Sequence, residues 1–240
     1  MFGEAYLNYR NNFVTALAFA LLLVFIPIFA MVANTNIESG TIIVDYSLMA
    51  GDAFGMAIVA GLVVLFLFFY SMFTSIMIFA VRRDQASVKL KYHLMEQIEK
   101  FSFKVFFFYL ILAAVIFAIN VAAIGIGLNV AVSAGISFII AALFLFVPQS
   151  IVIDEFSVGS AIAANLDFIS KNSGYLLYVL FVGAAFVGLT AIVEFAVDNF
   201  IYAGHYLTPI IVLVFIVPFI ECLKAVIYLR KFELLVARAD

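Results

Sequence analysis

Six long apolar segments alternate with shorter polar segments along the chain. The apolar segments are residues 13–32, 53–81, 105–124, 130–153, 175–197 and 209–229. Each has about 20 residues or more, the length that an α-helix needs to cross a hydrocarbon core about 30 Å thick. The strict alternation of polar and apolar residues that marks a membrane β-strand is not seen in them. The pattern predicts an all-α integral membrane protein with six transmembrane helices.

The connections between these segments predict how the helices pair. Residues 105–153 are apolar without interruption and too long for one span, and Gly125, Gly127 and Asn129 near the middle favour a tight turn. We therefore expect three transmembrane hairpins, formed by spans one and two, three and four, and five and six. Residues 1–240 are expected to form a single transmembrane domain.

A short amphipathic stretch precedes each odd-numbered span, around residues 5–12, 89–101 and 158–170. Such stretches are typical of helices that lie in the plane of the membrane interface. The fold expected is thus three hairpins, each preceded by a cytoplasmic interfacial helix. Two interpretations stay open: a threefold internal repeat, or the amphipathic lead-in that any helix entering a membrane needs.

The third amphipathic stretch carries the most detailed expectation. Val158, Ile162, Leu166 and Ile169 recur at helical spacing and predict a helix from about 158 to 170 with one apolar stripe. Ser157 is the expected N-cap, and the acidic pair before it suits the positive end of a helix. The sequence predicts a helix that sets the angle between the second and third hairpins.

Basic residues fall on one side of this topology. The twelve are Arg10, Arg82, Arg83, Lys89, Lys91, Lys100, Lys104, Lys171, Lys224, Arg230, Lys231 and Arg238. The opposite loops, residues 34–52, 125–129 and 198–208, contain none. Because Lys and Arg concentrate in cytoplasmic loops, both termini are expected in the cytoplasm, with the protein in the plasma membrane.

Composition agrees with this class and excludes others. Hydrophobic residues make up 68% of the chain and charged residues 11%, against about 45–50% and about 25% in soluble domains. A single cysteine, Cys222, excludes an internal disulfide bond. No catalytic motif occurs, and His93 and His205 fall on opposite sides of the membrane. We therefore expect no enzyme, no cofactor, no metal site and no nucleic-acid partner.

Ionisable residues inside apolar spans are costly and are candidates for function. Glu194, Glu221 and Lys224 are of this kind. Glu221 and Lys224 are three residues apart and share a helix face. They could form an ion-coupled or substrate-binding pair, or a self-satisfied pair in which Lys224 extends to the headgroups. Glu194 could line an external vestibule or lie at the interface.

Hydroxyl and amide side chains fall into two layers. An outer layer contains Asn120, Ser133, Ser137, Thr190 and Glu194, and an inner layer contains Ser71, Thr74, Ser75, Gln149, Ser150, Glu221 and Lys224. They could line two polar cavities separated by an apolar plug, or make ordinary hydrogen bonds between helices. Neither layer predicts a continuously open aqueous pore.

Two charged clusters are candidate contacts for lipid headgroups or a partner protein. One is the basic segment after span two, with Arg82, Arg83, Lys89, Lys91, Lys100 and Lys104. The other is the acidic pair Asp154 and Glu155 at the end of span four. Topology alone explains such a basic segment, and helix capping explains such a pair.

Residues 146–175 resemble a known pattern. A span ends near Pro148, an acidic pair follows, and a short helix leads to the membrane; the residues that carry this are Asp154, Glu155, Ala161, Ile162, Asn165, Phe168, Lys171 and Asn172. The pattern resembles the membrane domains fused to some glycerophosphodiester phosphodiesterases and their stand-alone prokaryotic relatives with six helices. The resemblance implies a membrane fold alone, because the hydrolase domain of that family is soluble and binds metal through residues that have no match here.

Two function hypotheses follow. The first is a non-enzymatic membrane module that binds lipids or assists the assembly of a membrane complex, with membrane lipids and a partner membrane protein or a second copy as partners. The alternative is a small secondary transporter or gated channel that uses Glu194, Glu221 and Lys224.

Overall fold

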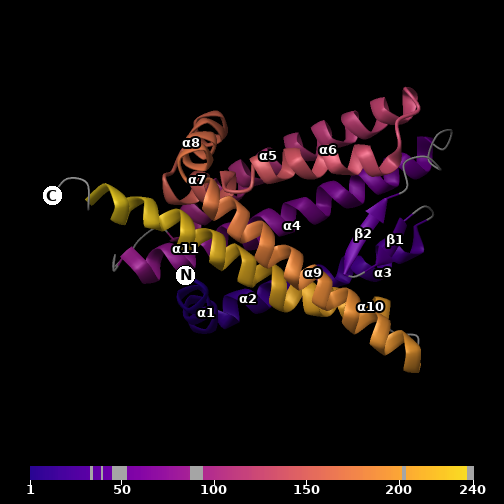
Figure 1. Cartoon of the computed structure of the whole chain (residues 1–240), viewed down its shortest axis with the longest axis horizontal. Helices are drawn as coiled ribbons and strands as arrows, with labels where there is room; N and C mark the ends of the chain where they lie inside the picture. Colours follow the sequence, from indigo (N-terminus) through magenta and orange to yellow (C-terminus); the bar gives the residue numbers. More distant parts are fainter. Residues whose placement is uncertain (33–34, 39, 45–52, 87–93, 202–203, 237–240) are drawn as a thin grey trace.

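The chain folds into long helices that run side by side, with short helices across one end (Figure 1). A computed structural model describes residues 1–32, 35–38, 40–44, 53–86, 94–201 and 204–236. Its elements are α1 (Phe2–Asn11), α2 (Phe13–Leu17), the 3₁₀ helix η1 (Ala18–Val24), α3 (Phe25–Met31), β1 (Thr35–Glu38), β2 (Thr41–Val44), α4 (Ala53–Ala86), α5 (Leu94–Gly125), α6 (Val130–Leu143), α7 (Val147–Ile153), α8 (Val158–Lys171), α9 (Ser173–Ile201), α10 (Gly204–Ile211), the π-helix η2 (Val212–Ile216) and α11 (Val217–Val236).

Six helical segments of the described chain are long and apolar enough to cross a membrane, as the sequence predicts. They are Phe13–Met31, Phe54–Asp84, Glu99–Gly125, Ala131–Ile153, Ser173–Phe200 and Tyr206–Lys231. Each coincides with one of the expected apolar segments. By the length and composition of these helices, the chain is a multi-pass membrane protein.

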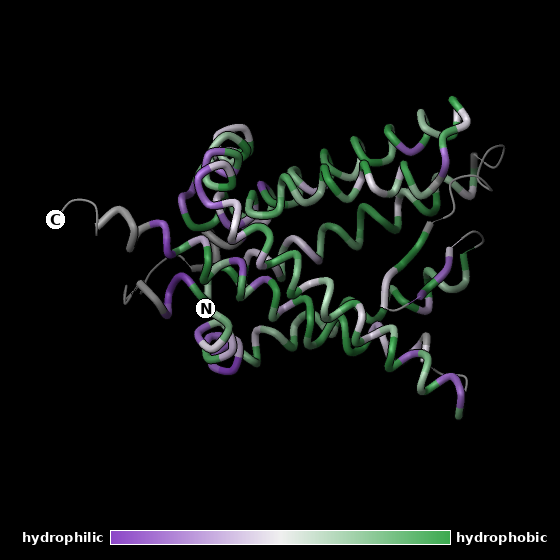
Figure 2. The backbone as a smooth tube through the Cα atoms, viewed as in Figure 1, coloured by the Kyte–Doolittle hydropathy of each residue, from purple (hydrophilic) through white to green (hydrophobic). Residues whose placement is uncertain are grey.

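The two ends of the bundle differ. The N-terminus lies at one end, together with α1, α8 and the last turns of α11, and we call this the terminal end (Figure 1). The α5–α6 turn, the two strands and the α9–α10 connection lie at the opposite, distal end. Hydrophobic residues follow the long helices, and hydrophilic residues gather mainly at the two ends (Figure 2).

The tightly packed core lies in the half of the bundle nearer the terminal end. All seven residues of α7 are buried. So is the run from Glu221 to Tyr228 on α11, and on α4 the run from Phe73 to Val81 is buried apart from the half-buried Ile76. These three helices pack against one another. Any polar side chain in these buried stretches of α4, α7 and α11 is therefore shielded from lipid and water.

Three of the six spans depart from regular α-helix, which the apolar pattern did not predict. The first contains seven residues of 3₁₀ helix, and the sixth contains the π-helix η2. These two irregular segments pack against each other. Pro218 follows η2 and has no N–H to donate to the Val214 carbonyl. The Tyr9 hydroxyl of α1 donates to that carbonyl over 3.4 Å.

The segment expected to be an external loop, residues 34–52, contains a short hairpin. β1 and β2 pair antiparallel, with Thr35 opposite Val44. Gly40 forms the turn with φ +75°, and a Cβ there would lie 2.4 Å from a Val212 methyl group and 3.0 Å from the Thr208 carbonyl oxygen. The hairpin thus packs closely on the sixth span, which requires glycine at this turn.

The fourth span is broken rather than continuous. Residues 144–146 form a turn between α6 and α7. The Asn165 side chain of α8, which is fully buried, spans this break. Its Nδ2 donates to the Leu143 carbonyl at 2.7 Å, and its Oδ1 accepts the Phe146 N–H at 3.0 Å. One amide therefore satisfies the end of α6 and the start of α7.

Helix α8 itself follows the prediction closely. It runs from Val158 to Lys171, and the Ser157 Oγ accepts the Ser160 N–H at 3.4 Å as its N-cap. The predicted apolar stripe is partly wrong, because Leu166 is exposed. The buried face is formed by Ala161, Asn165, Phe168 and Ile169. The Asn165 side chain docks into the break in span four, so the face of α8 that contains Asn165 is buried instead of the face that the apolar residues alone predict.

Candidate functional site

A buried ion pair lies within the sixth span. The Lys224 Nζ is 2.7 Å from the Glu221 Oε1, and the side chains are 5% and 2% exposed. The two residues are one turn apart on α11, as their spacing predicts. The two side chains pair with each other, as the self-satisfied interpretation expects, but Lys224 does not extend to the surface, so that part of the interpretation is wrong. Seven residues, about 10 Å of helix, separate Lys224 from the end of the span at Lys231.

Neighbouring helices complete the hydrogen bonds of the Glu221 carboxylate. Tyr70 of α4 donates its hydroxyl to Oε1 over 3.3 Å, and Gln149 of α7 donates Nε2 to Oε2 at 3.0 Å. Tyr109 of α5 packs its ring 5.3 Å from that of Tyr70 and interacts electrostatically with Glu221. Side chains of four helices thus converge on one carboxylate.

Several buried oxygen atoms on α4 and α7, the two helices that contact Glu221, make no hydrogen bond within the described part of the chain. They are Thr74 Oγ1 and Ser75 Oγ on α4 and Gln149 Oε1 and Ser150 Oγ on α7. Each belongs to a residue that is at most 1% exposed. A buried polar group without a partner costs about 1–3 kcal/mol, and such groups usually bind water or a ligand.

We call this group of side chains the polar cluster; it comprises Tyr70, Thr74, Ser75, Gln149, Ser150, Glu221 and Lys224. Six of the seven belong to the inner polar layer expected from the sequence. Tyr70 was missed, although a tyrosine in the middle of a span was a usable signal. Ser71, the remaining member of the layer, donates instead to the Phe68 carbonyl of its own helix at 2.8 Å.

Glu194 belongs to a different region. Thr208 of α10 donates to its Oε2 over 3.4 Å, and Asp198 one turn further along α9 accepts the Gly204 N–H at 2.6 Å. Glu221 follows Thr208 by 13 residues, about 20 Å of nearly continuous helix. Glu194 therefore joins the α9–α10 connection, whereas Glu221 and Lys224 belong to the polar cluster.

The other outer-layer residues do not gather into one cavity. Asn120 of α5 donates to the Ser137 Oγ at 3.0 Å and accepts from the Ser133 Oγ at 2.6 Å, which links α5 to α6. Thr190 donates to the Val187 carbonyl in its own helix. These contacts match the alternative of ordinary hydrogen bonding between and within helices.

Four candidate headgroup contacts converge on the connection between α7 and α8. Arg82 donates to the Val152 carbonyl at 3.0 Å and pairs with Glu155 at 3.0 Å. Lys104 donates to the Phe156 carbonyl at 3.2 Å. Asp154 accepts the Tyr228 hydroxyl at 2.6 Å and pairs with Lys231 at 2.5 Å. Asp154 therefore ties α7 to α11 rather than capping α8, and Tyr228 and Lys231 are partners that sequence reasoning missed.

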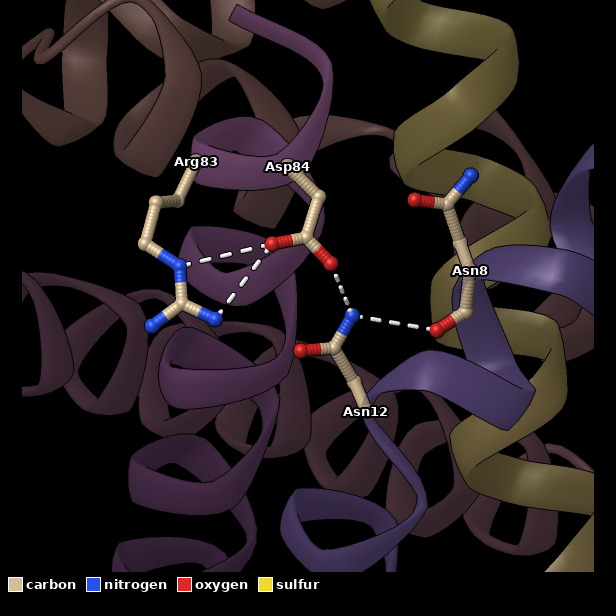
Figure 3. A network of polar contacts seen from close by, with 4 residues as sticks. All are labelled: Asn8, Asn12, Arg83 and Asp84. Atoms are coloured by element: carbon tan, nitrogen blue, oxygen red, sulfur yellow. Dashed lines mark hydrogen bonds and ion pairs between the residues drawn. The ribbon is translucent and has the colours of Figure 1, made fainter. Parts of the chain in front are cut away.

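The remaining basic candidates differ in their surroundings. Arg83 contacts the Asp84 Oδ1 at 3.3 Å, while the Asp84 Oδ2 accepts from Asn12 at 2.7 Å (Figure 3). Asn12 also donates to the Asn8 carbonyl at 3.0 Å. Lys100 is exposed on α5. Lys89 and Lys91 lie outside the described residues.

Tyr228→Phe should lower the stability of the folded protein. Tyr228 is fully buried, and its hydroxyl donates to the Asp154 carboxylate, whose side chain is 7% exposed. Hydrogen bonds to charged groups contribute about 1.5–3 kcal/mol, so we expect a loss in this range. Thermal unfolding in detergent measures it. Tyr6→Phe, at an exposed position of α1, is the control, and an equal effect of both would contradict the prediction.

The contact of α1 with α11 should weaken in acid. The Arg230 guanidinium donates to the Glu4 Oε2 at 2.6 Å and lowers the pKa of this carboxyl below its ordinary value of 4.5. A lowered folded-state pKa stabilises the contact above the unfolded pKa, and this contribution is lost as the pH falls through the folded value. Proteolysis of α1 should therefore accelerate below about pH 4.5 in the native protein. Glu4→Gln should remove this acceleration.

No group of three or more His, Cys, Asp and Glu side chains in the described part of the chain is placed to hold a metal ion. Comparison with models of protein families, with curated proteins and with solved structures finds no match for this chain. The resemblance over residues 146–175 stays a prediction.

Proposed function

We propose that this multi-pass membrane protein is a small secondary transporter or gated channel, and not an enzyme, whose solute site is the polar cluster. One observation carries the proposal: a Glu–Lys pair with side chains at most 5% exposed contacts α4 and α7, and these two helices carry four buried oxygen atoms without hydrogen-bond partners in the described residues. A solute or water that enters the cluster would find both charged groups and unused acceptors.

Stability gives little reason for such a pair. A buried ion pair can usually be replaced by well-packed apolar residues at no loss of stability, because desolvation offsets the attraction between the charges. Ionisable residues inside membrane spans instead mark ion and substrate pathways. The unpaired hydroxyl groups on α4 and α7 add to the cost. A site that exchanges its contents accounts for both features.

The irregular spans support the same function. Broken membrane helices expose backbone groups and let parts of a bundle move, and transporters commonly place their sites beside them. Here the break in span four lies just before Gln149, and η2 lies just before Pro218 and Glu221. Two of the three helices that supply the polar cluster are thus interrupted beside it.

The expected topology gives this site an orientation. The described basic residues outside the polar cluster, which are Arg10, Arg82, Arg83, Lys100, Lys104, Lys171, Arg230 and Lys231, belong to elements that meet at the terminal end. By the distribution of positive charge, this end faces the cytoplasm of a plasma membrane. In this proposal the spans form three hairpins, and α1 and α8 lie in the cytoplasmic interface.

Flux measurements test the proposed function. The purified protein is reconstituted into liposomes, and currents on a solid-supported membrane are recorded after jumps in pH, Na⁺, K⁺ or Cl⁻. We expect at least one jump to give a current that is absent from empty liposomes. Glu221→Gln should abolish it and Glu194→Gln should not, because Glu194 lies outside the polar cluster. Absence of any current, or equal currents in both variants, would count against the proposal.

A second candidate, a lipid-binding or assembly module, is favoured by a different observation. A surface pocket of about 480 Å³ at the terminal end is lined by Met1, Phe2, Gly174, Tyr175 and Tyr178. Aromatic and apolar walls with tyrosine hydroxyl groups suit a lipid at the interface. The resemblance of residues 146–175 to phosphodiesterase membrane domains is as compatible with this candidate as with a transporter or channel. Native mass spectrometry tests it: a lipid retained by the native protein and lost in Tyr178→Ala would support it.

A further inference from the structure

Four ionisable side chains follow one face of α11. Glu221, Lys224, Tyr228 and Lys231 are separated by three, four and three residues, so they lie one above the other along the helix. The first three are buried, with Tyr228 fully so, and the Lys231 side chain is 23% exposed at the terminal end. The face is therefore a polar line that begins inside the bundle and ends at its surface.

Helix α7 supplies matching polar groups along the same line. Gln149 donates to Glu221, and Asp154 accepts from both Tyr228 and Lys231. Ser150 lies between these contacts in the sequence of α7, one turn before Asp154, and its hydroxyl makes no hydrogen bond in the described residues. Polar side chains of α7 and α11 thus recur between the ion pair and the terminal end.

In the described residues of spans two, four and six, no such line of polar side chains continues from the ion pair toward the distal end. Residues 209–220 of the sixth span are all apolar, as are residues 54–69 of the second span, and residues 138–148 before Gln149 in the fourth. Water and ions have a high free energy in such surroundings. The Glu221–Lys224 pair is accordingly connected by polar groups to one side of the membrane and sealed from the other.

We infer that the α7–α11 interface is a one-sided path through which water carries protons between the terminal end and the Glu221–Lys224 pair. The exchangeable ligand is the proton. A proton that reaches Glu221 neutralises the carboxylate and removes its attraction for the Lys224 ammonium, so the pair acquires one positive charge. The unpaired Ser150 hydroxyl and Gln149 carbonyl oxygen are acceptors for the water molecules and for the released ammonium.

Other titratable groups surround the pair and belong to the same equilibrium. The groups that interact electrostatically with Glu221 are Tyr70 on α4, Tyr109 on α5 and Cys222 on α11. Asp84 of α4 and Tyr9 of α1 lie near Cys222. Closer to the terminal end, the titratable groups are Asp154, Tyr228 and Lys231. Glu221 accepts from three donors, and its protonation uses one acceptor position and removes the negative charge that strengthens these contacts. Proton binding is therefore coupled to the packing of α4, α7 and α11.

Labelling of a single cysteine tests the path. In a Cys222→Ala background, Ser150→Cys places a thiol of nearly the same size on the path. Ile151→Cys, its neighbour with the same 0% exposure, points about 100° away around the helix and is the matched control. A small charged thiol reagent is added to sealed vesicles from the side of the terminal end. We expect Ser150→Cys to be modified from this side only, and Ile151→Cys to be unmodified.

A second measurement uses the native side chains. The difference between infrared spectra of the native protein and of the double variant Glu221→Gln/Lys224→Met, both recorded in acid, should contain the band of one protonated carboxyl group, because all other carboxyl groups are common to both proteins. Failure of Ser150→Cys to react, its reaction from the distal side, equal reaction of both cysteines, or a difference spectrum without a carboxyl band would overturn the inference.

This inference rests on the proposed function for its purpose, but its test does not measure transport. Ion flux without labelling of Ser150→Cys would overturn the path and leave the proposed function intact. Labelling of Ser150→Cys together with the carboxyl band, but without any ion flux, would support the path and count against the proposed function. The two proposals can therefore fail separately.

Discussion

Replacement of Lys224 by Met is expected to lower the free energy of unfolding by about 3–5 kcal/mol, the usual cost of removing one partner from a buried ion pair. The Glu221 side chain is 2% exposed, and its carboxylate would keep Tyr70 and Gln149 as donors but lose its only adjacent cation among the described residues. Thermal unfolding in a mild detergent measures the loss. Met fills a similar volume, so the effect reports charge rather than packing.

The control for this experiment is another Lys–acid pair of the same chain. Lys171 pairs with Asp167 at 2.7 Å on α8, but these side chains are 66% and 61% exposed. Lys171→Met should therefore change stability by less than about 1 kcal/mol. The double variant Glu221→Gln/Lys224→Met should recover most of the loss, because it leaves no unpaired charge. Equal effects of the two single variants, or no recovery in the double variant, would contradict this account of the pair.

Asn165→Leu is expected to have an effect of similar size. The substitution leaves the Leu143 carbonyl and the Phe146 N–H without their partner at a buried site. Each buried group without a partner costs about 1–3 kcal/mol, so a loss of about 2–6 kcal/mol should follow. Proteolysis of the α7–α8 connection should also accelerate, because α8 no longer closes the break in span four. Both are measurable on purified protein.

Asn199→Leu provides the matched control for this substitution. Asn199 donates to the Phe195 carbonyl at 2.8 Å, but this contact is exposed near the end of α9. We expect its replacement to change stability by less than about 0.5 kcal/mol, as is usual for surface substitutions. If Asn165→Leu were equally mild, the Asn165 amide would not be what holds the broken span together.

The sequence predicted the six spans well because their signal is local. A run of about 20 apolar residues has few alternatives to a membrane helix, whatever it packs against. The Glu221–Lys224 contact was predictable for the same reason, since a spacing of three residues places both side chains on one face of a single helix. Helix α8 and its Ser157 cap also depend on neighbouring residues only.

Contacts between helices could not be predicted in this way. Nothing in the spacing of the chain says that Gln149 and Tyr70 meet Glu221, or that Asn165 bridges a break 20 residues earlier, because these contacts depend on how the helices pack. The charged residues Arg82, Lys104, Asp154 and Glu155 suited a headgroup site by position. They have partners within the chain because the α7–α8 connection lies among the ends of α4, α5 and α11.

The most direct test of the central claim is the current carried by the double variant Glu221→Gln/Lys224→Met on a solid-supported membrane. This variant keeps the volume of the polar cluster and should fold as stably as the native protein, but it has no ion pair. The account predicts that the native protein gives a current after a pH or ion jump and that the double variant gives none. A folded double variant with the native current would contradict the assignment of the polar cluster as the site of transport.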